Sequence, residues 1–134
     1  MSVFVNTVDS IGDEALTNSI IDRSITEIRD NYVTSIGTSA FNGCKSLTTA
    51  DFPAATSIGS SAFDSCSKLT TLILRSATMA TLGSTNAFSS TPIASGTGYI
   101  YVPAALVDSY KAASNWSTYA NQIRAIEDYP EICG

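Results

Sequence analysis

The sequence predicts a solenoid of short parallel β-strands with a helical segment at each end. Three observations favour this fold class: a 22-residue internal repeat, apolar residues at fixed positions of each copy, and helix-like stretches outside the repeats. At 134 residues the chain is long enough for one domain with a modest core. Apolar residues make up 44% of it and recur throughout, which argues against intrinsic disorder.

The repeat is clearest in two adjacent copies that align without a gap. They contain Ile36-Gly-Thr-Ser-Ala-Phe-Asn-Gly-Cys44 and Ile58-Gly-Ser-Ser-Ala-Phe-Asp-Ser-Cys66. A strand with the pattern Leu-x-x-Leu-x-Leu follows, and alternation predicts that Leu69, Leu72 and Leu74 point inward. One copy buries too little apolar surface to offset its ordering entropy, so successive copies must stack and share a core. We therefore expect Phe41 to stack on Phe63 and Leu47 on Leu69.

These copies resemble the BspA-like leucine-rich repeats of bacteria, whose pattern contains Ile-Gly-x-x-Ala-Phe-x-x-Cys. The resemblance covers roughly residues 24 to 103 and implies a right-handed β/α superhelix type of solenoid. It implies about four repeat strands, with irregular or short helical turns on the convex side. Arg75 departs from the family pattern, because it stands where Pro53 and Pro103 follow the other strands.

The two ends of the chain are expected to cap the stack. Residues 1–23 predict an N-terminal cap with a helix from Asp9 to Ile21, where Asp9 or Ser10 is the N-cap. Residues 104–134 predict a C-terminal cap that begins with a helix over 104–113 and continues with strand-like alternation over 123–126. Trp116 is expected to cover the last coil, in preference to stacking on a sugar.

Charge and composition argue against several classes of function. The net charge is −5 and the seven Lys and Arg residues are scattered, so nucleic acid and anionic membranes are poor partners. No run of apolar residues is long enough for a membrane span, and the first residues have neither the basic start nor the apolar run of a signal peptide. The chain has no histidine, which excludes Ser–His–Asp and Cys–His catalytic sites. We expect no catalytic residues, metal or cofactor.

The chain has three cysteines, two within the repeats and one near the end of the sequence. Cys44 and Cys66 occupy equivalent repeat positions, which favours small apolar residues in the core. A disulfide between neighbouring coils is the alternative, because stacked strands lie only about 4.8 Å apart. Cys133 lies in an end segment, as part of a frayed tail, a free thiol or an intermolecular bridge.

The outward face of the strands is the candidate ligand-binding surface. Alignment of the repeats places its side chains in two columns, and a solenoid presents such columns as one continuous surface. The first column is Glu27, Thr49, Thr71 and Tyr99, and the second is Arg29, Asp51, Ile73 and Tyr101. Ile73, Tyr99 and Tyr101 either form an exposed apolar patch or pack against the C-terminal cap.

The sequence therefore predicts a non-catalytic module, a monomer or weak oligomer, that binds a protein or glycan of unknown identity. The family resemblance implies adhesion or recognition by a cell-surface, secreted or virion-associated protein of a gut bacterium or phage. A structural spacer or assembly domain of a larger surface or phage particle is the alternative. A carbohydrate-active enzyme is a third reading, with less support because the twelve acidic residues show no arrangement that demands it.

Overall fold

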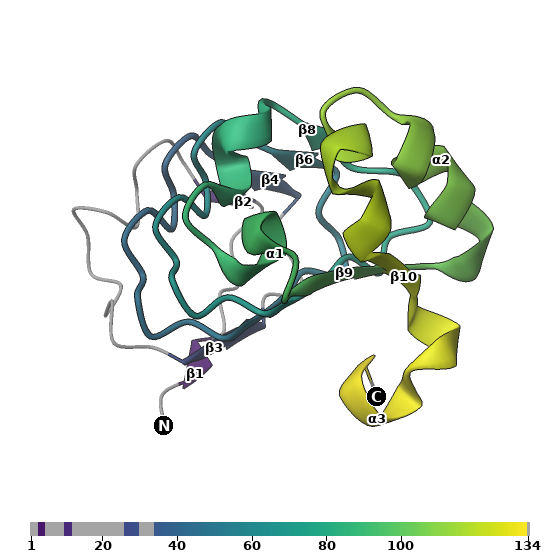
Figure 1. Ribbon diagram of the computed structural model, residues 1–134, viewed down its shortest axis with the longest axis horizontal. Coiled ribbons are helices and arrows are strands. Elements are labelled where there is room, and N and C mark those ends of the chain that lie inside the picture. Colours follow the sequence, from purple (N-terminus) through teal and green to yellow (C-terminus); the bar gives the residue numbers. More distant parts are fainter. Residues whose placement is uncertain (1–2, 5–9, 12–25, 30–33, 134) are drawn as a thin grey trace.

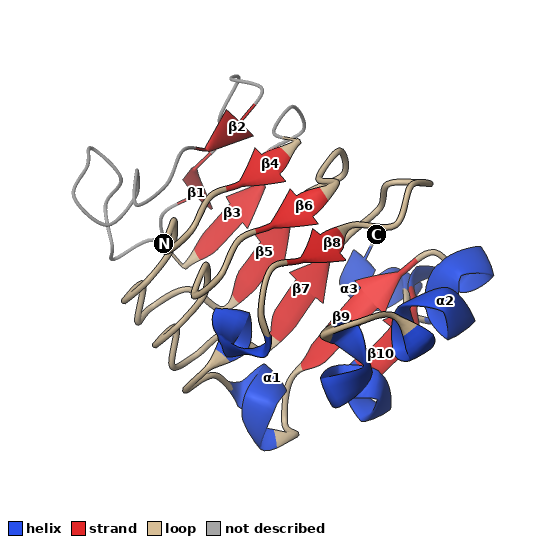
Figure 2. Ribbon diagram, turned by 90° about the horizontal axis from the view of Figure 1, so that it is seen from above, coloured by secondary structure: helices blue, strands red, loops and turns tan. Residues whose placement is uncertain are grey.

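Two parallel β-sheets run side by side along a stack of coils (Figures 1 and 2). The structure is a computed structural model and describes residues 3–4, 10–11, 26–29 and 34–133. Within these residues, the larger sheet contains, in order, β1 (Val3–Phe4), β3 (Glu27–Arg29), β5 (Thr49–Asp51), β7 (Thr71–Ile73), β9 (Tyr99–Val102) and β10 (Ile123–Ala125). The smaller sheet contains β2 (Ser10–Ile11), β4 (Ser35–Ile36), β6 (Ser57–Ile58) and β8 (Thr81–Leu82). The expected solenoid of parallel strands is confirmed.

The strands pair in the register that the repeat predicts. Ile28 is opposite Ala50, and Ala50 is opposite Leu72 in the next coil. Because side chains alternate along a strand, this register turns the same position of each strand toward the interior. Leu69, Leu72 and Leu74 are all buried, as the strand pattern predicts.

A column of phenylalanine rings fills the space between the strands and the opposite side of each coil. The centroids of Phe41 and Phe63 are 5.1 Å apart with the ring planes 1° from parallel. Phe88 continues the column, 5.8 Å from Phe63 at 5°. All three rings are fully buried, and Leu47 and Leu69 are buried in the same core cluster. The predicted stacking of Phe41 on Phe63 is confirmed.

The turns opposite the larger sheet also bond from coil to coil. Phe41 N–H donates to the carbonyl of Ala62 at 2.7 Å, and Phe63 N–H donates to the carbonyl of Ala87 at 2.8 Å. The first two described turns are irregular, whereas the third contains η1, a 3-10 helix over Thr85–Phe88. These turns form a third side of the coils, so backbone hydrogen bonds join neighbouring coils through the turns as well as through the two sheets.

Gly59 lies directly against the backbone of the preceding coil. A Cβ atom at this position would lie 2.6 Å from the backbone nitrogen of Thr38, closer than any real Cβ contact. Its own N–H donates to the carbonyl of Ile36 at 2.7 Å. Glycine is therefore required here because a side chain would push the coils apart.

The chain after the third described turn is mostly helical. Its elements are α1 (Pro92–Ser95), η2 (Ala104–Leu106), α2 (Val107–Ala112), η3 (Trp116–Gln122), η4 (Ile126–Asp128) and α3 (Pro130–Cys133). The helix expected over 104–113 forms as η2 followed by α2, and the expected strand forms as β10, which pairs with β9. Figure 1 shows α2 and the segment after it at the C-terminal end of the stack.

Side chains from this segment bind the backbone of the last coil of the smaller sheet. Trp116 Nε1 donates to the carbonyl of Ala80 at 2.8 Å, and the Tyr110 hydroxyl accepts from Ala80 N–H at 2.7 Å. Asn115 Nδ2 donates to the carbonyl of Leu82 at 2.7 Å. These bonds supply partners for backbone groups that no further strand of this sheet engages among the described residues. Trp116 is 1% exposed and has no open ring face for a sugar.

The N-terminal helix expected over Asp9–Ile21 is wrong at Ser10 and Ile11. These two residues form β2, which pairs with Ser35 and Ile36 in parallel. The physical reason is that the coil stack continues into this segment. There β2 adds a strand to the smaller sheet, as β1 adds one to the larger sheet by pairing with β3. All other positions of the expected helix lie outside the described residues. Both sheets thus begin within the segment for which a cap was expected.

Candidate ligand-binding face

The outward face of the larger sheet contains the two predicted columns. Strand pairing aligns Glu27 with Thr49, Thr71 and Tyr99, and aligns Arg29 with Asp51, Ile73 and Tyr101. The last strand, β10, adds Arg124 opposite Tyr101 in the second column. The register of the predicted columns is confirmed, and the second column extends one strand further than the sequence indicated.

The two columns differ in exposure. Glu27, Thr49, Thr71 and Tyr99 are half-buried and remain accessible, and Arg29 is exposed. By contrast, Asp51, Ile73 and Tyr101 are 2%, 2% and 3% exposed. The expectation that these three side chains are open to a ligand is wrong. Ile73 and Tyr101 belong to a second, smaller core on the outward side of the sheet, whereas Asp51 is buried as part of an ion-paired group.

The C-terminal tail covers this part of the face. Tyr129 packs its ring edge against Tyr101, with centroids 5.3 Å apart and planes at 66°. Ile126 also packs against the cluster of Ile73 and Tyr101. Figure 2 shows α3 beneath the strands at the C-terminal end of the stack. Of the two interpretations of the aromatic patch, the structure supports packing against the C-terminal segment.

Asp51 is held by two arginines. Arg75 binds it through both carboxylate oxygens, with Nε 3.1 Å from Oδ1 and Nη2 3.0 Å from Oδ2. Arg29 approaches Oδ2 at 3.3 Å from the neighbouring strand. Because Asp51 is buried, its charge requires such partners. Together with the Glu27 carboxylate on the same recess wall, these groups place two positive and two negative formal charges on this part of the face.

Arg75, like Arg124, is a residue of the candidate face that sequence reasoning missed. It departs from the family's proline, and this departure was the available signal. An arginine here reaches back across one coil to Asp51, 24 residues earlier. A proline has no side-chain donor for this carboxylate.

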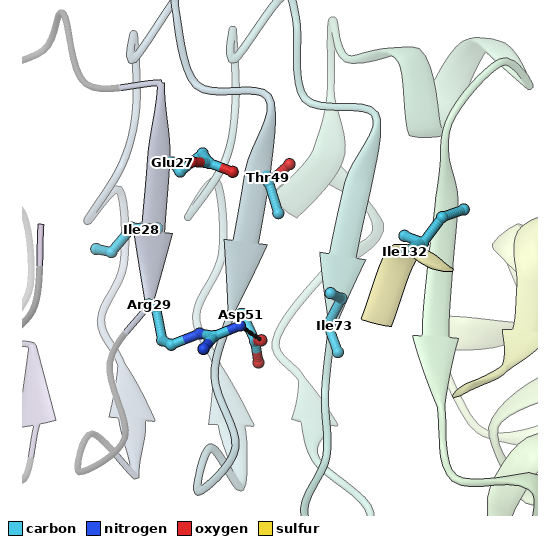
Figure 3. A pocket seen from close by; sticks show the side chains of 7 residues that line it. All are labelled: Glu27, Ile28, Arg29, Thr49, Asp51, Ile73 and Ile132. Atoms are coloured by element: carbon cyan, nitrogen blue, oxygen red, sulfur yellow. Dashed lines mark ion pairs between the residues drawn. The ribbon is translucent and has the colours of Figure 1, made fainter. Parts of the chain in front are cut away.

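A recess of about 240 Å³ lies between strands β3, β5 and β7 and the C-terminal tail (Figure 3). Its wall includes Glu27, Arg29, Thr49 and Asp51 on one side, and Ile73 and Ile132 on the other. In Figure 3 the Arg29 side chain extends toward Asp51, and Ile132 projects from α3. The recess therefore offers charged, hydroxyl and aliphatic groups within one small volume.

A second recess of about 300 Å³ shares Ile132 with the first. Its other lining residues are Tyr99, Tyr101, Arg124 and Tyr129. The Arg124 guanidinium lies over the Tyr99 ring, with Cζ 4.8 Å from the ring centroid, in cation–π geometry. Ile132 is the large apolar side chain most exposed among the described residues, at 44%. It forms the divide between a charged recess and an aromatic one.

The buried cysteines have no reactive arrangement. Cys44 and Cys66 are both free thiols, so the alternative of a disulfide between coils is wrong. Cys66 Sγ donates to the carbonyl of Phe41 at 3.1 Å. A hydrogen bond with Cys44, together with burial, raises the pKa of Cys66 above its usual value, which keeps it as a thiol. The structure does not describe the side chain of Cys133, so the interpretations of this cysteine stay predictions.

Within the described part of the chain, no three histidine, cysteine, aspartate or glutamate residues are grouped to hold a metal ion. Nor is any helix there both long and apolar enough to cross a bilayer.

Two sheets of paired parallel strands around one shared column of core residues define a repeat solenoid. The chain belongs to the BspA-type leucine-rich repeat family, because six copies of the repeat of that family match residues 2–102. The expected family is thus confirmed, and the match begins well before residue 24. No curated protein and no solved structure matches the chain. Membership indicates a repeat or protein-binding module, of a family that is typically non-catalytic.

Proposed function

We propose that this protein is a non-catalytic binding module that engages a protein or glycan through the outward face of the larger sheet. The setting we propose is adhesion or recognition at a cell or virion surface, with the chain as a monomer or weak oligomer. No step of this function requires a cofactor, because binding relies on side chains that the sheet holds in place.

The observation that supports this proposal is the accessible column beside the charged recess. Glu27, Thr49, Thr71 and Tyr99 lie one strand apart in a continuous row. The row borders the ion pairs of Asp51 with Arg29 and Arg75, so charged and hydroxyl groups lie side by side on this face. Since strand pairing fixes the backbone of each residue, a ligand binds without the entropy cost of ordering that backbone. The buried residues Ile73 and Tyr101 do not contact a ligand, but they hold the C-terminal tail against the sheet, and this tail forms one wall of the recess.

A capture experiment with the full chain tests this proposal. The wild type and two variants are screened on a glycan array and against surface extracts of candidate host cells. Thr71→Arg places a bulky charge in the centre of the accessible column, whereas Thr118→Arg adds the same side chain at an exposed position of η3. Both are surface changes, so unfolding free energies should stay within about 0.5 kcal/mol of wild type.

We expect Thr71→Arg to lower ligand capture at least about tenfold, the size of one disrupted polar contact. Thr118→Arg should capture as well as wild type. Equal capture by Thr71→Arg and wild type would overturn the proposal. If, in addition, changes at the ends of the stack alter the oligomeric state, the chain is better described as a spacer or assembly domain.

A further inference from the structure

The aromatic recess over β9 and β10 combines a cation with three phenol rings. We propose that it binds one carboxylate-bearing sugar residue of an acidic glycan. This inference rests on the proposed binding function of the outward face and names the ligand chemistry for one part of it. The recess volume of about 300 Å³ is at the small end of ligand sites, which suits a single sugar ring.

Arg124 supplies the charge. Its Nη1 donates to the carbonyls of Asn121 at 2.7 Å and Ile123 at 3.1 Å, which fixes the side chain over Tyr99. No carboxylate pairs with it among the described residues, whereas the guanidinium groups of Arg29 and Arg75 share Asp51. Its remaining donors are therefore open to a carboxylate from outside, which a guanidinium binds in a forked geometry.

The nearest acidic position along the chain does not neutralise this cation. Glu127 Oε1 accepts a hydrogen bond from Ala104 N–H at 2.9 Å, which commits that carboxylate to the start of η2. Glu127 is also absent from the lining of the recess. The recess therefore keeps a positive wall in a chain whose net charge is −5.

The tyrosines suit a hydroxylated ring. Tyr99 and Tyr129 are half-buried, and neither hydroxyl group forms a hydrogen bond with the described residues. Tyr101 lies between them, with its centroid 6.5 Å from Tyr99 and 5.3 Å from Tyr129. A phenol offers an apolar ring for the C–H groups of a sugar and a hydroxyl for its polar edge.

The backbone around the recess favours a sugar over the carboxyl end of a peptide. An extended peptide gains main-chain hydrogen bonds at a free strand edge, and the carboxyl end of a peptide is captured by a cluster of backbone N–H groups. Strand β9 has no free edge, because it pairs with β7 on one side and with β10 on the other. Strand β10 is the last strand of this sheet among the described residues, and it lines the recess through Arg124 alone. Recognition inside the recess therefore relies on side chains, as it does for a saccharide, and the peptide arm of the test below probes the edge of β10.

A matched pair of sugars tests the inference. The full chain, labelled with ¹⁵N, is titrated with methyl β-D-glucuronide and with methyl β-D-glucoside, which differ only in a carboxylate in place of a hydroxymethyl group. A short acetylated peptide with a free carboxyl end forms a third arm. Arg124→Gln removes the charge, Arg124→Lys keeps it, and Lys111→Gln removes an equal charge from an exposed position of α2.

We expect the glucuronide to shift the amide signals of Tyr99 and Arg124, and the glucoside to bind at least about tenfold more weakly. Arg124→Gln should lose the preference for the acid, Arg124→Lys should retain part of it, and Lys111→Gln should match wild type. If Arg124→Gln fails to fold, the shifts mapped in the wild type still decide whether the recess is the site.

Three outcomes would overturn the inference: equal affinity for both sugars, shifts away from Tyr99 and Arg124, or binding of the peptide in place of the glucuronide. Failure of this kind is distinguishable from failure of the proposed function. If Thr71→Arg still loses capture while no acidic sugar binds the recess, the face binds a ligand of another chemistry.

Discussion

Adding one methyl group at Gly59 tests how closely the coils are packed. In Gly59→Ala the new Cβ would lie 2.6 Å from Thr38 N, 2.8 Å from Gly37 C and 3.0 Å from Thr38 Cα, all of them backbone atoms. Ordinary contacts begin at 3.4 Å, so relief of the shortest contact requires a separation of about 0.8 Å (3.4 − 2.6). Such a separation weakens the 2.7 Å bond between Gly59 N–H and the Ile36 carbonyl.

The expected cost follows from these terms. Overpacking costs about 1–3 kcal/mol and a weakened hydrogen bond about 0.5–1.5 kcal/mol. Reduced freedom of the unfolded chain returns about 0.4–1 kcal/mol. We therefore expect Gly59→Ala to lower the free energy of unfolding by about 2 kcal/mol, within a range of about 0.5–4 kcal/mol, which urea denaturation followed by Trp116 fluorescence will measure.

Gly83→Ala provides a graded control. Its Cβ would lie 3.0 Å from the nearest atom, Ser60 N, and 3.3 Å from the next two. We expect a smaller loss than at Gly59, because a shift of a few tenths of an ångström relieves the contact. The reasoning is refuted if Gly59→Ala stabilises the protein by about 0.4–1 kcal/mol, as at an unconstrained glycine, or if the two variants reverse their order.

Three further changes test the core, the ion pair and the ends. Phe63→Ala should cost about 3–5 kcal/mol in urea denaturation because the ring is fully buried, and a loss below 1 kcal/mol would contradict its place in the column. Asp51→Asn should cost about 1–3 kcal/mol in the same assay, because two arginines lose their buried carboxylate partner, and an unchanged stability would contradict the ion pair. Burial raises the pKa of Tyr110 above 10.0. The stability from this shift is therefore present below pH 10 and lost as pH rises through the raised pKa, so thermal unfolding of Tyr110→Phe should depend less on alkaline pH than that of wild type.

The repeat made the register of the larger sheet predictable from sequence. A spacing of 22 residues without gaps leaves one way to align Thr49 with Thr71 and Asp51 with Ile73. It also fixes Phe41 over Phe63, because equivalent positions of a solenoid must stack. These features depend on local periodicity, which is fully present in the sequence.

The N-terminal strand was missed because two local patterns compete there. Asp9 and Ser10 followed by Asp13 and Glu14 have the composition of a capped helix start. The same segment contains Ser10-Ile-Gly12, which matches Ser35-Ile-Gly37 and Ser57-Ile-Gly59. This triplet was the signal for β2, and pairing with β4 outweighs the helical preference at Ser10 and Ile11.

The covering of the outward face was not predictable from the repeat. Whether Ile73 and Tyr101 are exposed depends on where residues 126–132 pack, and that segment has no repeat pattern. Likewise, the bond from Arg75 to Asp51 depends on a side chain that crosses between coils. Long-range packing of an irregular tail is a tertiary property that strand periodicity does not encode.

The most direct test of the account is the order of the aromatic rings in solution. Selective labelling of phenylalanine allows nuclear Overhauser effects to be measured between the ring protons of Phe41, Phe63 and Phe88. The account predicts contacts between Phe41 and Phe63 and between Phe63 and Phe88, whose centroids are 5.1 and 5.8 Å apart, and none between Phe41 and Phe88. A direct contact between Phe41 and Phe88, or none between Phe41 and Phe63, would contradict the stacked coils on which the proposed binding face depends.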